Sequence, residues 1–138
     1  MHALIIEDEV FIGCLVEDGL RALGFTSCDL AASEEQAIDY AVDHCPDLVT
    51  ADHRLSGGSG VNAVLNICQS TAIPVVFIVA EASDVSDLIP SAIILRKPFN
   101  RDGLKQAVAE ALAHPYRNEA QPPPRGEWGS AALEHLAA

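Results

Sequence analysis

The chain has 138 residues, of which 49% are hydrophobic and 20% charged, and its formal net charge is −12. This length suits one domain with a sizeable core, and the hydrophobic fraction argues against disorder. A charge this negative disfavours direct nucleic-acid binding, which needs basic groups to neutralise phosphates.

Membrane and secretory features are absent from the sequence pattern. The four cysteines are scattered without a Cys-x-x-Cys pair, which favours free thiols in a reducing compartment. Met1-His2 leads directly into an apolar run, without a basic leader or an apolar stretch of membrane length. We therefore expect a cytoplasmic protein with no membrane association.

Strand-like and helix-like segments alternate five times along the chain. The expected strands cover residues 3–6, 25–31, 48–51, 74–79 and 92–95. The expected helices cover residues 9–23, 33–45, 59–70, 83–88 and 100–113. Short apolar runs are typical of buried parallel strands, and the more polar second run fits a sheet edge. The repeated βα units predict an α/β fold, a doubly wound five-stranded parallel sheet with helices on both faces.

Capping residues mark several of the expected helix ends. Gly24 supplies a stop for the first helix, and Ser33 with Gln36 fits a capping box at the start of the second. Asn100 is expected to cap the last helix. Within the first helix, Val10, Phe11, Cys14 and Leu15 recur at helical spacing and predict an inward face, to which Asp18/Gly19 is an open addition.

The composition changes towards the C-terminus. Residues 121–126 (QPPPRG) cannot pack as a helix or strand, and Trp128 precedes a short segment with only marginal helix potential. The remaining length is too small for a DNA-binding or catalytic domain. We expect one domain over residues 1–114 and a Pro-rich, flexible tail over residues 115–138.

Polar residues stand where three of the apolar runs end. Glu7-Asp8 follows the first run, Asp52 follows the third and Lys97-Pro98 follows the fifth. Because the site of an open α/β sheet lies at the carboxyl ends of its strands, folding should gather three carboxylates and one ammonium there. Like charges placed together raise one another's pKa, and a divalent cation removes that cost. The residues therefore predict a magnesium-dependent aspartate site.

With these motifs in order on the expected strands, residues 3–113 resemble the receiver domain of bacterial two-component response regulators. The resemblance implies a flavodoxin-like sheet of order 2-1-3-4-5, in which Asp52 accepts a phosphoryl group from a histidine kinase and Lys97 contacts that group. It also implies a Mg²⁺ site of three carboxylates and one main-chain carbonyl, from Glu7, Asp8, Asp52 and Arg54. The residue types suit this chemistry, because a carboxylate can attack phosphorus and Mg²⁺ prefers oxygen ligands.

Two positions depart from the family pattern. Val79 stands where the family has a Ser or Thr that bonds the phosphoryl group, and Ile94 stands where it has Tyr or Phe. A valine cannot make a hydrogen bond that is worth roughly 1.5–3 kcal/mol to a charged acceptor. Residues 80–96 are also fewer than the family norm. Arg54 and Glu81, which flank the pocket in the family, either pair across it or remain solvated. We expect phosphorylation chemistry without the usual conformational switch.

Each motif also has an ordinary structural interpretation. Glu7 and Asp8 can be first-turn acids that the helix dipole favours. Asp52 can be a turn residue before residues 57–60, where glycines allow positive φ. That glycine-rich loop is expected to be a turn and not a phosphate cradle. The five histidines show no ligand spacing and are expected at the surface.

Three functions from different classes are compatible with the sequence. The first is a stand-alone receiver that signals by protein contact or acts as a phosphate sink. The second is a pseudo-receiver, a binding module with atypical or phosphorylation-independent switching. The third is an aspartate-nucleophile phosphatase, but that class needs an aspartate where Arg54 stands. We expect that the protein is not an enzyme and that its only catalytic activity is slow self-catalysed phosphorylation and dephosphorylation. The expected partners are a sensor histidine kinase or phosphotransfer protein and a protein target, and homodimerisation is an open alternative.

Overall fold

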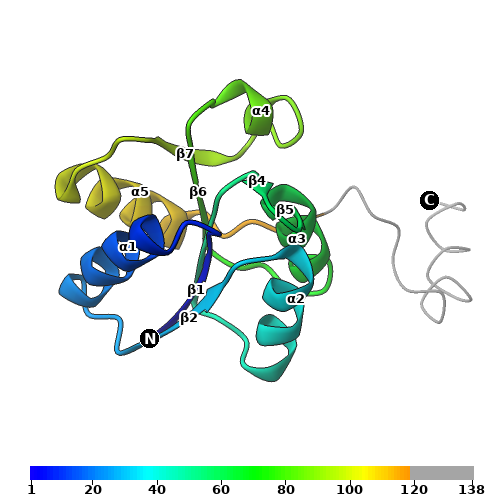
Figure 1. Cartoon of the computed structure of the whole chain (residues 1–138), viewed down its shortest axis with the longest axis horizontal. Coiled ribbons are helices and arrows are strands. Elements are labelled where there is room, and N and C mark those ends of the chain that lie inside the picture. Colours follow the sequence, from blue (N-terminus) through cyan, green and yellow to red (C-terminus); the bar gives the residue numbers. More distant parts are fainter. Residues whose placement is uncertain (119–138) are drawn as a thin grey trace, which may run out of the picture.

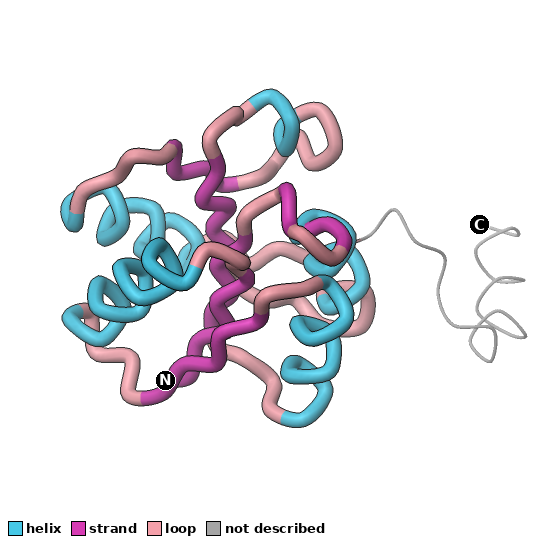
Figure 2. Tube along the Cα trace, viewed as in Figure 1, coloured by secondary structure: helices cyan, strands magenta, loops and turns pink. Residues whose placement is uncertain are grey.

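Five parallel strands form a sheet of order β2-β1-β3-β6-β7, with helices on both faces (Figure 1; Figure 2). This computed structural model describes residues 1–118. The sheet contains β1 (His2–Ile6), β2 (Ser27–Ala31), β3 (Leu48–Ala51), β6 (Val75–Val79) and β7 (Ile93–Arg96). The helices are α1 (Val10–Ala22), α2 (Glu34–Asp43), α3 (Gly60–Ile67), α4 (Ser83–Ser86) and α5 (Arg101–Ala113). The predicted doubly wound sheet, its strand order and its more polar edge strand are confirmed.

A short antiparallel hairpin follows β3. Its strands are β4 (Arg54–Leu55) and β5 (Gly58–Ser59). Gly58 has a φ of 97°, which a residue with a side chain rarely adopts. The prediction that the glycine-rich loop is a turn is therefore confirmed.

The two faces of the sheet bury separate apolar cores. Along β1, Ala3 and Ile5 face the core beneath α1 and α5, while Leu4 and Ile6 face the core beneath α2 and α3. Figure 1 shows these two helix pairs on opposite sides of the sheet. Because both faces are covered, the central strands are buried at every position and mostly apolar, with Thr50 of β3 a polar exception, and this is why they appear as nearly continuous apolar runs in the sequence.

The predicted caps form. Ser33 Oγ accepts a hydrogen bond from the Gln36 N–H at 3.1 Å. Gln36 Oε1 accepts from the Ala32 N–H at 2.8 Å, one residue earlier than in a standard capping box. Asn100 Oδ1 accepts from a first-turn amide of α5 at 2.7 Å. Gly24, with a φ of 103°, ends the turn after α1.

The predicted inward face of α1 is wrong except at its open addition, Gly19, which is buried. Its apolar side chains point outward: Val10 is 75% exposed, Phe11 73% and Leu15 43%. The buried face instead carries two glycines, because a Cβ at Gly13 would lie 3.1 Å from a Leu30 methyl and one at Gly19 would overlap Leu104. Apolar periodicity overlooks such a face, since glycine does not count as apolar. The residues that α1 buries are Gly13, Val16, Gly19 and Leu20.

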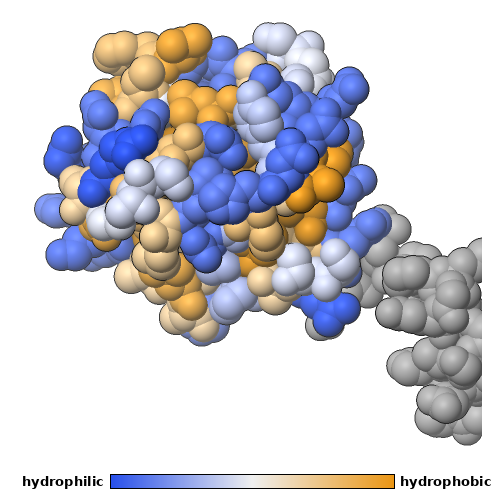
Figure 3. Space-filling model, turned by 90° about the horizontal axis from the view of Figure 1, so that it is seen from below, coloured by the Kyte–Doolittle hydropathy of each residue, from blue (hydrophilic) through white to orange (hydrophobic). Residues whose placement is uncertain are grey.

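Apolar residues therefore reach the surface in several places. On the face shown in Figure 3, apolar patches lie among hydrophilic ones. None of the helices within residues 1–118 has the length and apolar character needed to cross a membrane.

The chain continues to pack on the domain after α5 ends. Residues 115–118, which we call the C-terminal strap, cross to the carboxyl end of α3. Tyr116 and Ile73 exchange two backbone hydrogen bonds of 2.8 and 2.9 Å. The Asn118 N–H donates to the Cys68 carbonyl at 3.0 Å, and its Nδ2 donates to the Leu65 carbonyl at 2.9 Å. Contacts with the domain thus extend past residue 114, and the rest of the expected tail, residues 119–138, lies outside the described residues.

One histidine does not follow the expectation for a surface residue. His2 is 6% exposed, and its ring stacks on the His44 ring with centroids 3.8 Å apart. Its Nδ1 lies 2.7 Å from Ser27 Oγ and its Nε2 lies 3.0 Å from Asp29 Oδ2. The prediction fails because β1 begins at His2 and pairs with β2, which places that ring between two polar side chains of the neighbouring strand.

Candidate functional site

The carboxyl ends of β1, β3 and β7 bring Glu7, Asp52 and Lys97 together. Lys97 Nζ donates to Glu7 Oε1 and to Asp52 Oδ2, both at 2.8 Å. Lys97 is 90 positions from Glu7 and 45 from Asp52 in the sequence, so these contacts form only because the parallel sheet brings the strand ends together. The meeting of these side chains, predicted from the strand ends, is confirmed.

Asp8 joins this cluster from the loop after β1. Its Oδ2 accepts hydrogen bonds from the Ser56 N–H and the Ser56 hydroxyl, both at 2.8 Å. These bonds favour the ionised carboxyl, so the Ser56 hydroxyl above all lowers the pKa of Asp8. No sequence signal pointed to Ser56, because a hairpin residue has no periodicity that would place it.

Burial and charge act against each other within the cluster. The Glu7 side chain is 4% exposed, and burial raises its pKa despite the bonds from Lys97 and the Glu9 N–H. Burial alone would lower the pKa of Lys97, but its hydrogen bonds to Asp52 and Glu7 outweigh this and raise it. The ammonium is therefore held charged between two carboxylates.

The cluster fits a divalent cation. Glu7, Asp8 and Asp52 each offer an oxygen, and the three oxygens lie within 4.8 Å of one another. Three carboxylates beside one ammonium leave excess negative charge, and hard oxygen ligands of this kind suit Mg²⁺. The fourth ligand predicted from the family, the Arg54 main-chain carbonyl, belongs to β4, two residues after Asp52.

The backbone around Asp52 fixes its side chain. The Asp52 N–H donates to the Ile6 carbonyl at 2.9 Å, and Asp52 Oδ1 accepts from the His53 N–H at 2.7 Å. A Cβ at position 60 would collide with the Asp52 carbonyl oxygen, so this close approach requires Gly60. One carboxylate oxygen of Asp52 thus bonds the backbone and the other bonds Lys97.

The two atypical positions, Val79 and Ile94, lie on the neighbouring strands. Val79 is the last residue of β6 and is 1% exposed. Ile94 is half-buried in β7, beside Phe77. The Lys97 N–H donates to the Val79 carbonyl at 2.8 Å, and the Lys97-Pro98 peptide bond is cis. The helix between these strands, α4, has only four residues, in line with the small number of residues over 80–96.

Arg54 and Glu81 do not pair across the pocket. Arg54 Nε and Nη2 instead lie 3.3 Å from Asp84 Oδ2 in α4, with the arginine side chain 81% exposed. Glu81 is exposed and makes no hydrogen bond or ion pair within residues 1–118. The pairing alternative is therefore wrong for Glu81. The short α4 turns Asp84 towards Arg54, a geometry that loop residues do not reveal in sequence.

Comparison with known proteins decides the family. The response regulator receiver domain family matches residues 3–109. This chain belongs to that family. Receiver domains are signalling modules and are generally not enzymes.

This receiver domain is similar to parts of larger regulators and to one protein of about its own size. It is 31% identical over 113 residues to the phyllosphere-induced regulator PhyR of Methylorubrum extorquens, covering 79% of this chain and 42% of that protein. It is 30% identical over 114 residues to the chemotaxis protein CheY of Bacillus subtilis, covering 79% and 95%. The chain spans 24% to 51% of the first three curated relatives.

Solved structures agree with the observed sheet. The receiver domain of Erythrobacter litoralis PhyR has a TM-score of 0.73 at 31% identity and covers 88% of this chain and 94% of its own. The receiver domain of NtrX from Brucella abortus has a TM-score of 0.71 at 28% identity, with coverages of 81% and 98%.

Proposed function

We propose that this receiver domain accepts a phosphoryl group on Asp52 from a sensor histidine kinase or phosphotransfer protein. The observation that carries the proposal is the meeting of Asp52 with Glu7, Asp8 and Lys97 at one edge of the sheet. Lys97 donates to two of these carboxylates at 2.8 Å, so its ammonium stands where a group added to Asp52 would lie. That arrangement suits a site that must bind a further anionic group.

The transfer is a displacement at phosphorus. A carboxylate oxygen of Asp52 attacks the phosphorus of a phosphohistidine, the new P–O bond forms as the P–N bond breaks, and the electron pair remains on the imidazole. Lys97 then releases Asp52 Oδ2 and donates to the phosphoryl oxygens, so its ammonium offsets the added charge.

A magnesium site beside Asp52 is part of the proposal. Glu7, Asp8, Asp52 and the Arg54 main-chain carbonyl would hold the ion, and when bound it supplies positive charge next to the transferred group. Ser56 keeps Asp8 ionised and fixes its direction, which prepares that ligand.

The exposed face of α1 supports contact with a protein donor. The helix begins two residues after Asp8, and its outward side chains Val10, Phe11 and Leu15 form an apolar surface next to the site. A surface of this kind favours a protein partner over a membrane or nucleic acid, given the net charge of −12. A cytoplasmic location and a homodimer are compatible with this and remain part of the proposal.

The output is proposed to be a protein contact or a phosphate sink, with a pseudo-receiver as the second candidate. Val79 and Ile94 favour that second candidate, because neither can act as the usual switch residue. PhyR of Bartonella quintana, whose solved structure is similar to this chain, is an anti-anti-sigma factor, which supports output by protein contact in this family. Any catalysis by the chain itself would be limited to slow self-phosphorylation and dephosphorylation.

Intact mass spectrometry tests the function. Incubation with acetyl phosphate and Mg²⁺ should add one phosphoryl group to the wild type and none to Asp52→Asn. A matched control, Asp87→Asn, changes an exposed aspartate outside the site and should keep the wild-type rate. An Asp52→Asn protein that gained phosphate at the wild-type rate would remove Asp52 from the acceptor role. A wild type that gained none would favour the pseudo-receiver.

A further inference from the structure

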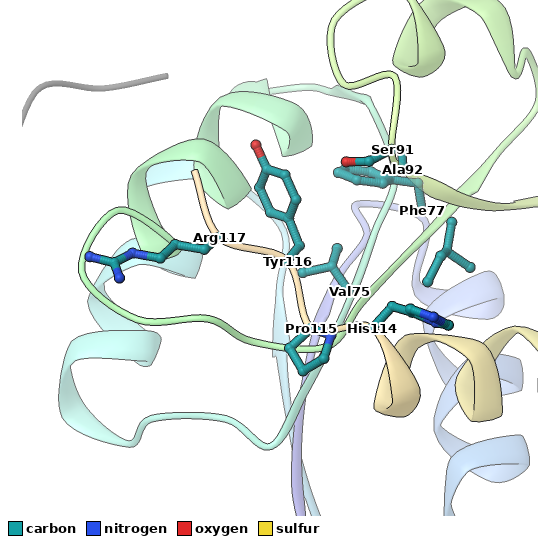
Figure 4. A pocket seen from close by; sticks show the side chains of 9 residues that line it. Val75, Phe77, Ser91, Ala92, His114, Pro115, Tyr116 and Arg117 are labelled. Atoms are coloured by element: carbon teal, nitrogen blue, oxygen red, sulfur yellow. The ribbon is translucent and has the colours of Figure 1, made fainter. Parts of the chain in front are cut away.

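A cavity of about 280 Å³ opens beside β6 and β7, on the face away from α1 and α5 (Figure 4). Its floor is apolar, made by Val75 and Phe77. Ala92 lies on one side of the cavity, and Tyr116 of the C-terminal strap stands opposite. The cavity is separate from the carboxylate cluster, because none of its lining residues belongs to that site.

Two features of this chain create the cavity. The first is the four-residue α4, which leaves little helix to cover β6 and β7. The second is the strap, which its two backbone bonds with Ile73 hold against this face. Tyr116 is half-buried there, and burial raises the pKa of its hydroxyl. The opening is therefore bounded on one side by the chain's own C-terminal segment.

The strap also decides where the rest of the chain leaves the domain. Asn118 is 3% exposed and donates hydrogen bonds to the carbonyls of Cys68 and Leu65. Residue 119 therefore follows only three positions after Tyr116, which lines the cavity. The chain then runs to residue 138 and contains its single tryptophan, Trp128. Ten extended residues reach about 33 Å, which is ample for Trp128 to return to the cavity.

We propose that this cavity is a docking site for the chain's own residue Trp128. Its volume lies just below the roughly 300–1,000 Å³ typical of ligand pockets, which suits one large side chain better than a drug-sized molecule. The apolar floor fits the indole, whose burial would remove a large apolar surface from water. Arg117, exposed at the rim and without an ion pair in residues 1–118, has an acidic counterpart in Glu127.

The tether makes even a weak site effective. A short linker gives an effective concentration on the order of 1 mM, so a site with a Kd of about 0.1 mM would be filled roughly nine-tenths of the time. Docking would place the tail against β6, the strand that ends at Val79. The inference does not depend on phosphorylation, and its test uses no phosphodonor.

Fluorescence of the full chain provides the test, because Trp128 is the only tryptophan. We expect blue-shifted emission and acrylamide quenching several-fold weaker than for a free tryptophan derivative. Ala92→Arg puts a long side chain into the cavity wall and should restore strong quenching. The matched control Ala109→Arg adds the same group on the exposed face of α5 and should leave quenching unchanged. Circular dichroism of both variants checks that the sheet still forms.

Three results would overturn the proposal. Strong quenching of the wild type would mean that Trp128 is exposed. Protection that survives Ala92→Arg would place Trp128 somewhere else. If the protection of Trp128 disappeared on dilution, Trp128 would be docking into a second copy of the chain and not into its own cavity.

Discussion

The two parts of the sheet's carboxyl edge are equipped differently. At the ends of β1, β3 and β7, Lys97 bonds Glu7 and Asp52 at 2.8 Å, and Ser56 bonds Asp8 twice at the same distance. At the end of β6, the buried side chain of Val79 offers no hydrogen-bonding group. Under the proposed function, the first region would accept the phosphoryl group, while the second lacks the hydroxyl that the family couples to it. Phosphorylation and conformational response would then be separate properties of this domain.

The side-chain linkage from the charged region to α4 is also weak. The side-chain contact that joins the loop after β3 to α4 is the Arg54–Asp84 pair, at 3.3 Å and with Arg54 81% exposed. Exposed pairs contribute about 0–1 kcal/mol. A ligand shifts a conformational equilibrium only through contacts that differ between its states, and the ion pair that reaches α4 is an exposed one.

The largest expected effect comes from removing the lysine. Lys97→Met leaves the buried Glu7 without its ammonium and should lower the free energy of unfolding by about 2 kcal/mol. This loss of stability is smaller than for breaking a fully buried ion pair, because Glu7 can take up a proton. Urea unfolding measures it, with Lys105→Met on the exposed face of α5 as a control that should change little.

The same variant has a pH signature. The pKa of Glu7 is already raised above its usual 4.5, and loss of Lys97 raises it further. A folded state that retains a proton which the unfolded state releases loses stability as the pH rises above about 4.5. The loss of unfolding free energy caused by Lys97→Met should therefore be larger at pH 7 than at pH 5. An equal deficit at both values would contradict the assigned contact between Lys97 and Glu7.

A smaller effect should come from Mg²⁺. At ten times its Kd, a ligand of the folded state adds about 1.4 kcal/mol, or roughly 4–6 °C in Tm for a domain of this size. Asp8→Ala should abolish this Mg²⁺-induced rise, whatever its own starting Tm. Asp18→Ala, at an exposed position of α1, should keep it. A full rise in Asp8→Ala would remove Asp8 from the metal site.

The smallest effect is expected at the α4 contact. Asp84→Asn should change the free energy of unfolding by less than about 0.5 kcal/mol, because its partner is mostly exposed. Asp87→Asn, in the same segment, serves as the comparison. A loss above 1 kcal/mol in Asp84→Asn alone would show that the two regions are coupled more tightly than their contacts indicate.

The sequence predicted the charged end of the sheet well, and for a simple reason. Parallel strands end at a common edge, so Glu7, Asp52 and Lys97 had to meet once their strands were recognised. The caps at Ser33 and Asn100 were equally local signals.

Features that depend on tertiary approach were not predictable. The inward face of α1 uses Gly13 and Gly19, whose role is to let Leu30 and Leu104 come close, so apolar spacing selected mainly the opposite face and included Gly19 only as an open addition. The strap at Tyr116 has no periodicity, and its pairing with Ile73 exists only in the folded chain. The partner of Arg54 depended on the path of a four-residue helix.

The contrast between the two regions is tested most directly by amide hydrogen exchange with and without beryllofluoride, a phosphoryl mimic, in the presence of Mg²⁺. In the wild type we expect slower exchange around Asp52 and in residues 54–59, and little change over residues 80–100. Val79→Thr combined with Ile94→Tyr restores both switch residues and should enlarge the change over residues 80–100. A large rearrangement of residues 80–100 in the wild type would contradict the account.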